Sequence, residues 1–270
     1  MARNRASVIG LAILVALLLM TVLPFLLAGD PNAQTLSQSL KPPSFSHLLG
    51  TDKLGRDVWS RIVYGAAPTL LGAFVVITIS GVIGIPLGLI AGYYGGRTDS
   101  LIMRILDAVL AIPQLVSALA IVATFGAGFF QVMIAIGVGT IPVYARITRG
   151  QVLSEREQDY VLAAASMGAD SRRILVRHIL PNILSPLIVQ GSLGIAFAIL
   201  AEASLSFLGV GIKPPDPTWG GMLSEGLQLI NRAPWLSIFP GIAIFITVLS
   251  INTIGDTLRD ILDPRLRGSR

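Results

Sequence analysis

Long apolar stretches without a charged side chain dominate this sequence. The first covers residues 6–29, and the others cover 62–96, 108–145, 179–201 and 233–255. A helix needs about 20 apolar residues to cross a hydrocarbon core of about 30 Å. The pattern therefore predicts an all-α polytopic membrane protein with six transmembrane helices, at about 6–28, 69–94, 103–125, 130–147, 183–207 and 236–255.

The first apolar stretch begins as a secretory leader does, with Arg3 and Arg5 in front of it. Cleaved leaders have apolar cores of about 7–15 residues. The stretch here is longer and can cross a bilayer. We therefore expect an uncleaved first span.

The basic residues predict an orientation. Lys and Arg collect on the cytoplasmic side of membrane proteins. With the N-terminus inside, 14 of the 20 Lys and Arg fall in inside segments or at the span ends next to them. The chain is therefore predicted to be N-in and C-in, which places the segment between the fourth and fifth spans in the cytoplasm.

Two outer segments have a character of their own. In the first outer segment we expect a short amphipathic helix at the membrane interface. Its apolar face is formed by Leu54, Val58, Trp59, Ile62 and Val63. The charged residues Arg56, Asp57 and Arg61 are expected to lie off this face. We accordingly divide the chain into residues 1–68 and a core of five spans, 69–270, with a cytoplasmic loop at 150–182. In the second outer segment, 208–234, Trp219 is predicted to anchor the chain at the interface.

Composition supports the membrane assignment and excludes several classes of protein. The chain is 53% hydrophobic and 13% charged, whereas soluble domains carry about 25% charged residues. It has no Cys and two His, too few for a disulfide framework, a thiol nucleophile or a His-based metal site. No P-loop, H-E-x-x-H or G-x-S-x-G motif is present. We expect neither an enzyme nor a cofactor or metal site, so any ATP would be bound by another chain.

Three glycines recur every fourth residue in the second span, at Gly84, Gly88 and Gly92. Such a stripe lets another helix approach closely. It is consistent with a contact to another subunit, with a moving interface, or with packing inside this chain.

Two charged residues lie within or next to predicted spans. Carboxylates at membrane depth usually face protein or water. Glu202 either lines a solute path, or is a polar residue near the interface or hydrogen-bonded to a neighbouring helix. Asp107 is expected to pair with Arg104, three residues before it on the same helix.

The segment "YVLAAASMGADSRRILVRHILPN" (160–182) predicts two short helices. The first ends at Gly168, where glycine permits a positive φ, and it exposes the alanines at 163–165. Asp170 or Ser171 can cap the second, at about 171–179. Pro181 is expected to break the chain before the fifth span.

A helix, a glycine turn and a basic helix also form the pattern of a DNA-binding helix-turn-helix. The segment has about 32 residues between two membrane tethers and lacks a core of its own. Duplex DNA would press against the bilayer. The pattern favours a protein partner with acidic groups, while a membrane-bound regulator of nucleic acid and a passive channel are the alternatives from other classes.

The same segment resembles the motif E-A-A-x-x-x-G-x9-I-x-L-P of ATP-binding-cassette (ABC) importer permeases. Ala163, Ala164 and Gly168 keep the spacing, whereas Leu162 replaces the glutamate and His178 the isoleucine. The resemblance implies that this loop couples to an ATPase subunit through Tyr160, Leu162, Ala163, Ala164, Gly168, Arg172, Leu180 and Pro181.

More of the chain, about residues 46–266, resembles the C-type subunit of the dipeptide, oligopeptide and nickel branch. Stretches such as "HLLGTDKLGRDVWSRIVYGA" and "EASLSFLGVGIKPPDPTWGGMLSEG" carry this likeness. It implies a type I importer permease of the bacterial cytoplasmic membrane, a B-type permease partner, two ATPases that bind ATP and Mg, and an outer solute-binding protein. The implied solutes are di- and oligopeptides, with nickel chelates and glutathione as alternatives.

Overall fold

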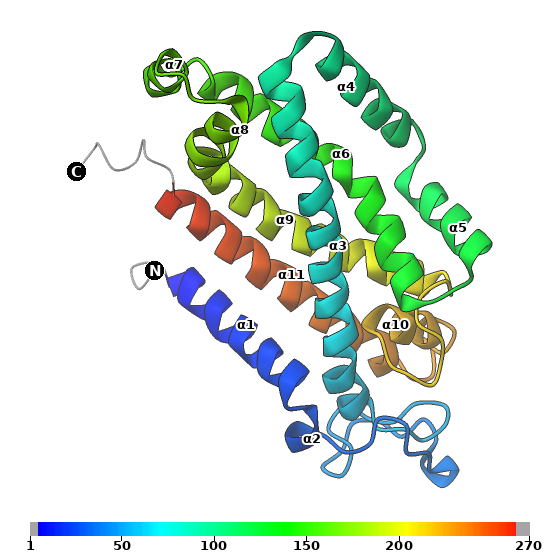
Figure 1. The fold of residues 1–270 in the computed structure, drawn as a ribbon. Coiled ribbons are helices and arrows are strands. Elements are labelled where there is room, and N and C mark those ends of the chain that lie inside the picture. The colour runs from blue at the N-terminus through cyan, green and yellow to red at the C-terminus, as the bar shows by residue number, and fades with distance from the viewer. Residues whose placement is uncertain (1–4, 263–270) are drawn as a thin grey trace.

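The computed structural model describes residues 5–262, and all regular secondary structure within them is helical (Figure 1). The longer helices cross the bundle and the shorter ones gather at its two ends. The elements are α1 (Arg5–Val22), α2 (Pro24–Leu27), η1 (Leu36–Gln38), α3 (Val58–Tyr94), α4 (Gly96–Ala111), α5 (Gln114–Phe125), α6 (Phe129–Glu155), α7 (Asp159–Ser166), α8 (Ser171–Arg173), a π-helical turn η2 (Ile174–Ile179), α9 (Leu180–Phe207), α10 (Trp219–Leu227) and α11 (Trp235–Leu262).

Four described helical segments are long and apolar enough to cross a membrane: α3, α6, the run 171–207 and α11. A fifth span arises if α4 and α5 count as one. The apolar part of α1, Ser7–Val22, is shorter than these, and α2 follows it after Leu23. The all-helical prediction is confirmed for the described chain, while six spans are not.

The predicted span at 103–125 falls on two helices, α4 and α5, which form one span only if the bent pair counts as one. The chain bends by 83° between α4 and α5, where Ile112 is extended and Pro113 precedes α5. Proline has no N–H and disfavours helical backbone in the residue before it. The break follows from that restriction.

The glycine stripe packs α3 against α6 of the same chain. A Cβ on Gly88 would lie 2.4 Å from the Ala145 carbonyl oxygen, and one on Gly92 would lie 2.8 Å from the Cβ of Val152. At Gly84 the nearest atom, 2.7 Å away, is the Cβ of Tyr144. Only glycine permits this helix separation, so the stripe makes an intrachain contact.

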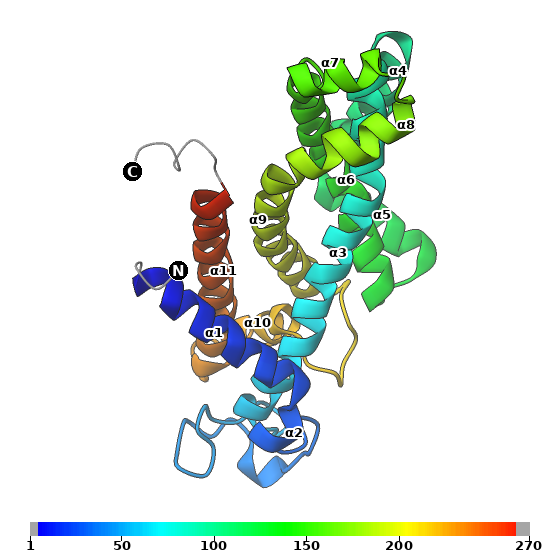
Figure 2. The same ribbon diagram turned by 60° about the vertical axis from the view of Figure 1, so that its left-hand side comes forward.

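The two ends of the described chain lie at the same end of the bundle. The hydroxyl oxygens of Ser7 in α1 and Thr257 in α11 are 2.7 Å apart, in a buried hydrogen bond. Figure 2 shows α1 and α11 side by side, with α7 and α8 at the opposite end from the loop that follows α2.

The expected separate amphipathic helix near residue 58 is not formed. Instead α3 begins at Val58 and continues to Tyr94, so the proposed boundary at residue 68 falls inside it. Asp57 caps this helix by accepting a hydrogen bond from the Ser60 amide at 2.9 Å. Val58 is fully buried, because the first turns of α3 pack under the outer loops rather than on lipid.

The prediction that Trp219 anchors the chain at the membrane interface is also wrong. Its side chain is fully buried, and its indole N–H donates to the Ile62 carbonyl at 2.9 Å. Gly65 provides the space, since a Cβ there would lie 3.1 Å from Trp219 Cδ1. Trp219 therefore joins α10 to the first turns of α3.

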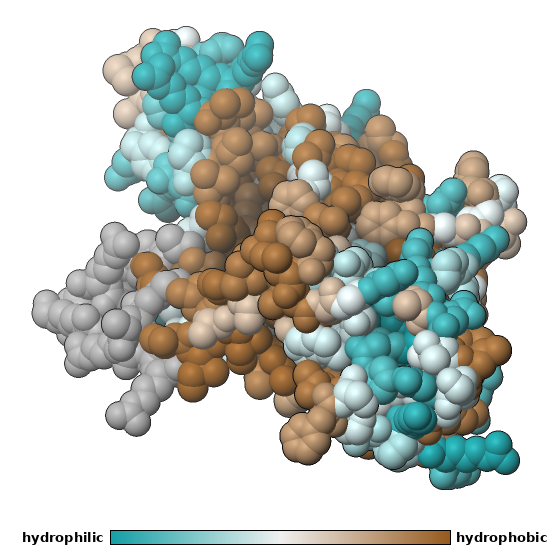
Figure 3. Space-filling view, turned by 90° about the horizontal axis from the view of Figure 1, so that it is seen from below, coloured by the Kyte–Doolittle hydropathy of each residue, from teal (hydrophilic) through white to brown (hydrophobic). Residues whose placement is uncertain are grey.

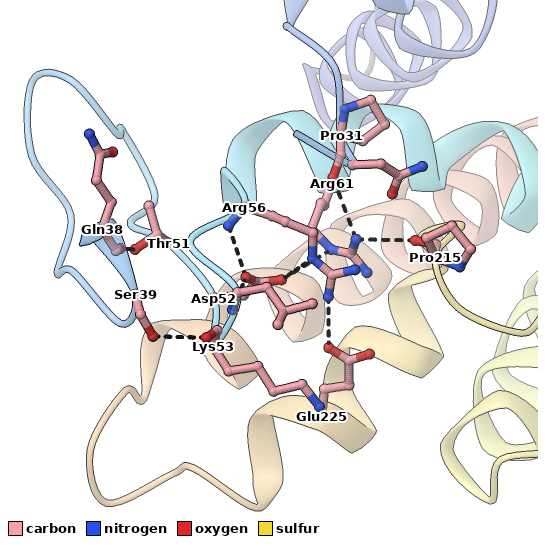
Figure 4. A network of polar contacts seen from close by, with 12 residues as sticks. Pro31, Gln38, Ser39, Thr51, Asp52, Lys53, Arg56, Arg61, Pro215 and Glu225 are labelled. Carbon is pink, nitrogen blue, oxygen red and sulfur yellow. Dashed lines mark hydrogen bonds and ion pairs between the residues drawn. The ribbon is translucent and has the colours of Figure 1, made fainter. Parts of the chain in front are cut away.

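A buried ionic network holds the two outer segments together (Figure 4). Arg56 Nε donates to Asp52 at 2.5 Å, and its guanidinium reaches Glu225 of α10 at 3.3 Å. Arg61 donates to the Pro215 carbonyl at 3.2 Å. Both arginines are almost completely buried, contrary to their expected place off the apolar face of an interfacial helix. Viewed from this end, hydrophilic side chains gather over part of the surface beside the apolar bundle (Figure 3).

Candidate functional site

The segment at 160–182 forms a hairpin of α7 and the helical run that starts with α8. α7 ends where Gly168 adopts φ +83°, and the Ala169 amide donates back to the Ala164 carbonyl at 3.1 Å. This confirms the predicted positive φ at Gly168. Asp170 precedes α8, but its side chain makes no capping hydrogen bond.

The predicted break at Pro181 is wrong, because helix continues from Ser171 through Phe207. A π-helical turn, η2, comes just before the proline, and the Leu180 amide bonds to the Leu175 carbonyl, five residues back. A π turn widens the helix locally. It gives space to the proline ring, which would otherwise press on a carbonyl of the preceding turn.

A polar cluster connects α6, α7 and the start of α9. The Tyr160 hydroxyl donates to Glu155 at the end of α6 and accepts from Asn182 Nδ2 at 3.0 Å. Asn182 also donates to the His178 carbonyl at 2.6 Å. Partial burial and the hydrogen bond to Glu155 raise the pKa of Tyr160 to about 12, so the phenol is neutral at physiological pH.

Apolar side chains fix the hairpin to the bundle. Val161 of α7 and Ile174, Leu175 and Ile179 of the second arm are buried, together with Leu89 of α3, Val152 of α6, and Ile183 and Leu187 of α9. The hairpin therefore rests on the ends of three long helices.

The outward face of the hairpin is apolar with a basic border. Leu162 is 53% exposed, Met167 83% and Val176 57%, and Arg172 is exposed beside them in sequence. Ala163 and Ala165 are exposed, but Ala164 is buried at 4%. The expectation of three exposed alanines is corrected at this position, because Ala164 lies on the same helix face as Val161.

The end of the motif lies where the second arm enters the bundle. Leu180 is half-buried and Pro181 exposed. The remaining predicted residues of the loop, Tyr160 and Gly168, are exposed as well. The structure thus brings the predicted coupling residues into one hairpin, with all of them except Ala164 at least partly accessible.

Ion pairs that the sequence did not predict hold α4 beside α6. Asp99 accepts two hydrogen bonds from Arg149, at 2.5 and 2.6 Å. Asp107 pairs with Arg146 of α6, so the expected pair with Arg104 in the same helix is wrong. Contacts between residues about 40–50 positions apart leave no local signal in a sequence.

Glu202 is buried in α9, with 2% of its surface exposed. Its Oε1 accepts a hydrogen bond from the Ser206 hydroxyl at 2.6 Å, and Oε2 has no partner among the described residues. Its hydrogen-bond partner therefore lies in α9 itself and not in a neighbouring helix.

Comparison with known proteins supports the resemblance of the sequence. Residues 84–268 match the profile of the family described as binding-protein-dependent transport system inner membrane component. Residues 1–43 match the N-terminal transmembrane domain of oligopeptide transport permease C.

Curated relatives are similar over nearly the full chain. The dipeptide transport system permease protein DppC of Alkalihalophilus pseudofirmus is 44% identical over 98% of this chain and 88% of its own length. The probable D,D-dipeptide transport system permease protein DdpC of Escherichia coli is 43% identical over 98% and 89%. The glutathione transport system permease protein GsiD of Pectobacterium atrosepticum is 46% identical over 83% and 75%.

The fold matches a solved transporter. A chain of the MetNI methionine ABC transporter in an inward-facing conformation superposes with a TM-score of 0.63 at 20% identity, covering 75% of this chain and 96% of that one. At this identity the match concerns the fold alone. Together these findings show that the chain belongs to the binding-protein-dependent transport system inner membrane component family, as a multi-pass inner-membrane protein.

Proposed function

We propose that this chain is one of the two membrane subunits of an ATP-driven, binding-protein-dependent importer of di- and oligopeptides. It would pair with a B-type permease, two ATPases that bind ATP and Mg, and an outer solute-binding protein. Six spans with both ends in the cytoplasm, and no catalytic role for this chain, belong to the same proposal. Relatives named as dipeptide or di/tripeptide permeases, at 42–44% identity, support it.

The hairpin formed by α7, α8 and η2 carries the proposal. Its inner face is buried on the ends of α3, α6 and α9, while its outer face exposes Leu162 and Met167. A hairpin packed in this way transmits a displacement to the bundle, because it cannot move without the helices against which it packs. Closure of the ATPases on ATP would shift the bundle between inward-open and outward-open states, by favouring one of them.

Leu162 gives this contact a particular character. In the family motif a glutamate would offer a charge to the ATPase, whereas here an exposed leucine offers apolar surface. We propose that the docking contact combines this apolar surface with basic residues such as Arg172. An acidic rim on the ATPase would complement them.

Glutathione is the second candidate solute, and nickel chelates are a third. The glutathione permease relative, at 46% identity over 225 residues, favours the former. A nucleic-acid-binding hairpin is not proposed, because the second arm is continuous with α9 and its apolar face is already buried.

The proposal is tested by reconstituting the complete complex, with its binding protein, in liposomes. A panel of di- and tripeptides, glutathione and nickel–histidine is screened for stimulation of ATP hydrolysis and for uptake. ATP-dependent uptake of peptides, absent without the binding protein, is the expected result. Uptake of glutathione or nickel alone would replace the solute, and uptake without ATP would reject the importer.

A further inference from the structure

A cavity of about 410 Å³ lies beside the break between α4 and α5. Its walls come from both sides of the break and from α6 and α9. The polar residues among them are Gln114, Ser117, Thr140 and Gln190. The volume is within the range of small-molecule sites, about 300–1,000 Å³.

The break itself suggests why a cavity is present here. Pro113 and Gln114 line it, at the point where the chain bends by 83°. Irregular backbone at membrane depth is tolerated where it lies in protein or lines a water-filled cavity. In transporters, interrupted helices of this kind form solute sites.

The two glutamines have different surroundings. Gln114 Nε2 donates to the Ile136 carbonyl at 3.2 Å and lies 3.5 Å from the Thr140 hydroxyl. Gln190, in the middle of α9, has no side-chain hydrogen bond to any residue within 5–262. Its side chain is half-buried and lines the cavity, so its amide is free to bond to a solute there.

A second unpaired polar group lies behind the same wall. The Tyr144 hydroxyl is buried without a partner among the described residues. It lies 3.0 Å from where a Cβ on Gly194 would be, and Gly194 lines the cavity. Buried hydroxyls almost always have a partner, so the Tyr144 hydroxyl of α6 is a second polar group beside the cavity that is free to bond.

We propose that this cavity contacts the solute during translocation, and that Gln190, with Gln114, hydrogen-bonds to its peptide bonds. A glutamine amide offers a donor and an acceptor, as a peptide bond does. The rest of the lining, including Leu193 and Phe197, is apolar and accepts side chains of different shapes. The site would read the backbone common to all peptides. This inference rests on the proposed function.

The test compares a dipeptide with its N-methylated analogue, which lacks the amide donor. Uptake of dialanine and of N-methyl dialanine is measured in the reconstituted complex with wild-type chain and with Gln190→Met. The same binding protein delivers both solutes in each case, so a change in the ratio of their rates reports the permease. The ratio is the uptake rate of dialanine divided by that of N-methyl dialanine. Because Gln190→Met loses one hydrogen bond to the peptide amide, we expect this ratio to fall roughly three- to tenfold in the variant.

The matched control is Gln131→Met, which changes a glutamine of α6 outside the cavity and is expected to leave the ratio unchanged. Because the chain has no cysteine, Ser117→Cys offers a second readout, in which peptide should slow labelling by a small thiol reagent. An unchanged ratio in Gln190→Met would overturn the inference. If the complex still takes up peptide in an ATP-dependent manner, the proposed function is upheld even so. If the thiol of Ser117→Cys stays unreactive in every state, the partner permease covers the cavity. That result would overturn the inference as well.

Discussion

The side-chain amide of Asn182 donates to the phenolic oxygen of Tyr160 at 3.0 Å, joining residues 22 positions apart. Through this bond α7, the first helix of the hairpin, is connected to the start of α9. Tyr160 is also bonded to Glu155 at the end of α6. One hydroxyl therefore fixes the orientation of α7 relative to two long helices.

Replacing Tyr160 with Phe removes that hydroxyl and keeps the ring. We expect the number of peptides transported per ATP to fall about three- to tenfold, since hydrogen bonds of this kind contribute about 0.5–1.5 kcal/mol. With the pKa of Tyr160 at about 12, the hydrogen bond that the phenol donates to Glu155 is present below pH 10 and is lost as the pH rises through the folded-state pKa. The defect should therefore be the same at neutral and mildly basic pH. Tyr64→Phe, in the outer half of α3, is the control, and equal coupling ratios in the two variants would refute the role.

Replacing Gly88 with Ala tests the glycine stripe. Its Cβ would lie 2.4 Å from the Ala145 carbonyl oxygen and 2.5 Å from Thr148 Cβ, so α3 and α6 must separate. We expect a loss of roughly 1–3 kcal/mol, as for other overpacked contacts, seen as a lower midpoint of thermal unfolding in detergent. Gly81→Ala in the same helix meets only Ile85 at 3.8 Å and should leave the midpoint near the wild-type value. A common midpoint for the two variants would show that the contact is looser than described.

Replacing Arg56 with Met tests the outer ionic network. Asp52, 5% exposed, would lose its closest cation. Removal of one partner of a buried pair costs about 3–5 kcal/mol, and the connection to Glu225 is lost at the same time. We expect a lower unfolding midpoint and faster proteolysis of the outer loops. Arg232→Met, at an exposed position, is the control, and a smaller effect for Arg56 than for Arg232 would contradict the network.

Replacing Leu162 with Glu restores the family motif but places a charge on the apolar docking surface. The side chain is 53% exposed, so the fold should be kept. We expect the ATPase to bind several-fold more weakly, measured as its retention on the immobilised permease complex, whereas Leu162→Met should bind normally. Tighter retention of the Glu variant would mean that the ATPase offers a cation here.

Local features of the sequence predicted much of this molecule. Four of the six predicted spans lie within continuous helices, and Gly168 ends α7 with the positive φ that its place suggested. The glycines at 84, 88 and 92 indicated a close helix contact, although the identity of the partner helix came from the structure. Periodicity and turn residues act over a few positions and are readable without a fold.

Features that depend on distant residues were missed. Trp219 suggested an interfacial anchor and instead fills a notch at Gly65. Arg56 and Arg61 suggested solvent and are buried, because their partners come from segments up to 169 residues away.

The coupling role of the hairpin is tested most directly at Gly168. Its φ of +83° is costly for other residues, by roughly 1–2 kcal/mol, and least so for Asn. Nothing lies within 4 Å of a Cβ there, so a substitution acts through the turn and not through a clash. The decisive measurement is peptide transported per ATP hydrolysed in proteoliposomes containing Gly168→Val, with Gly168→Asn as the control. A roughly tenfold lower ratio for Val, with Asn near wild type, is the predicted result, and an unchanged ratio for Val would contradict the account.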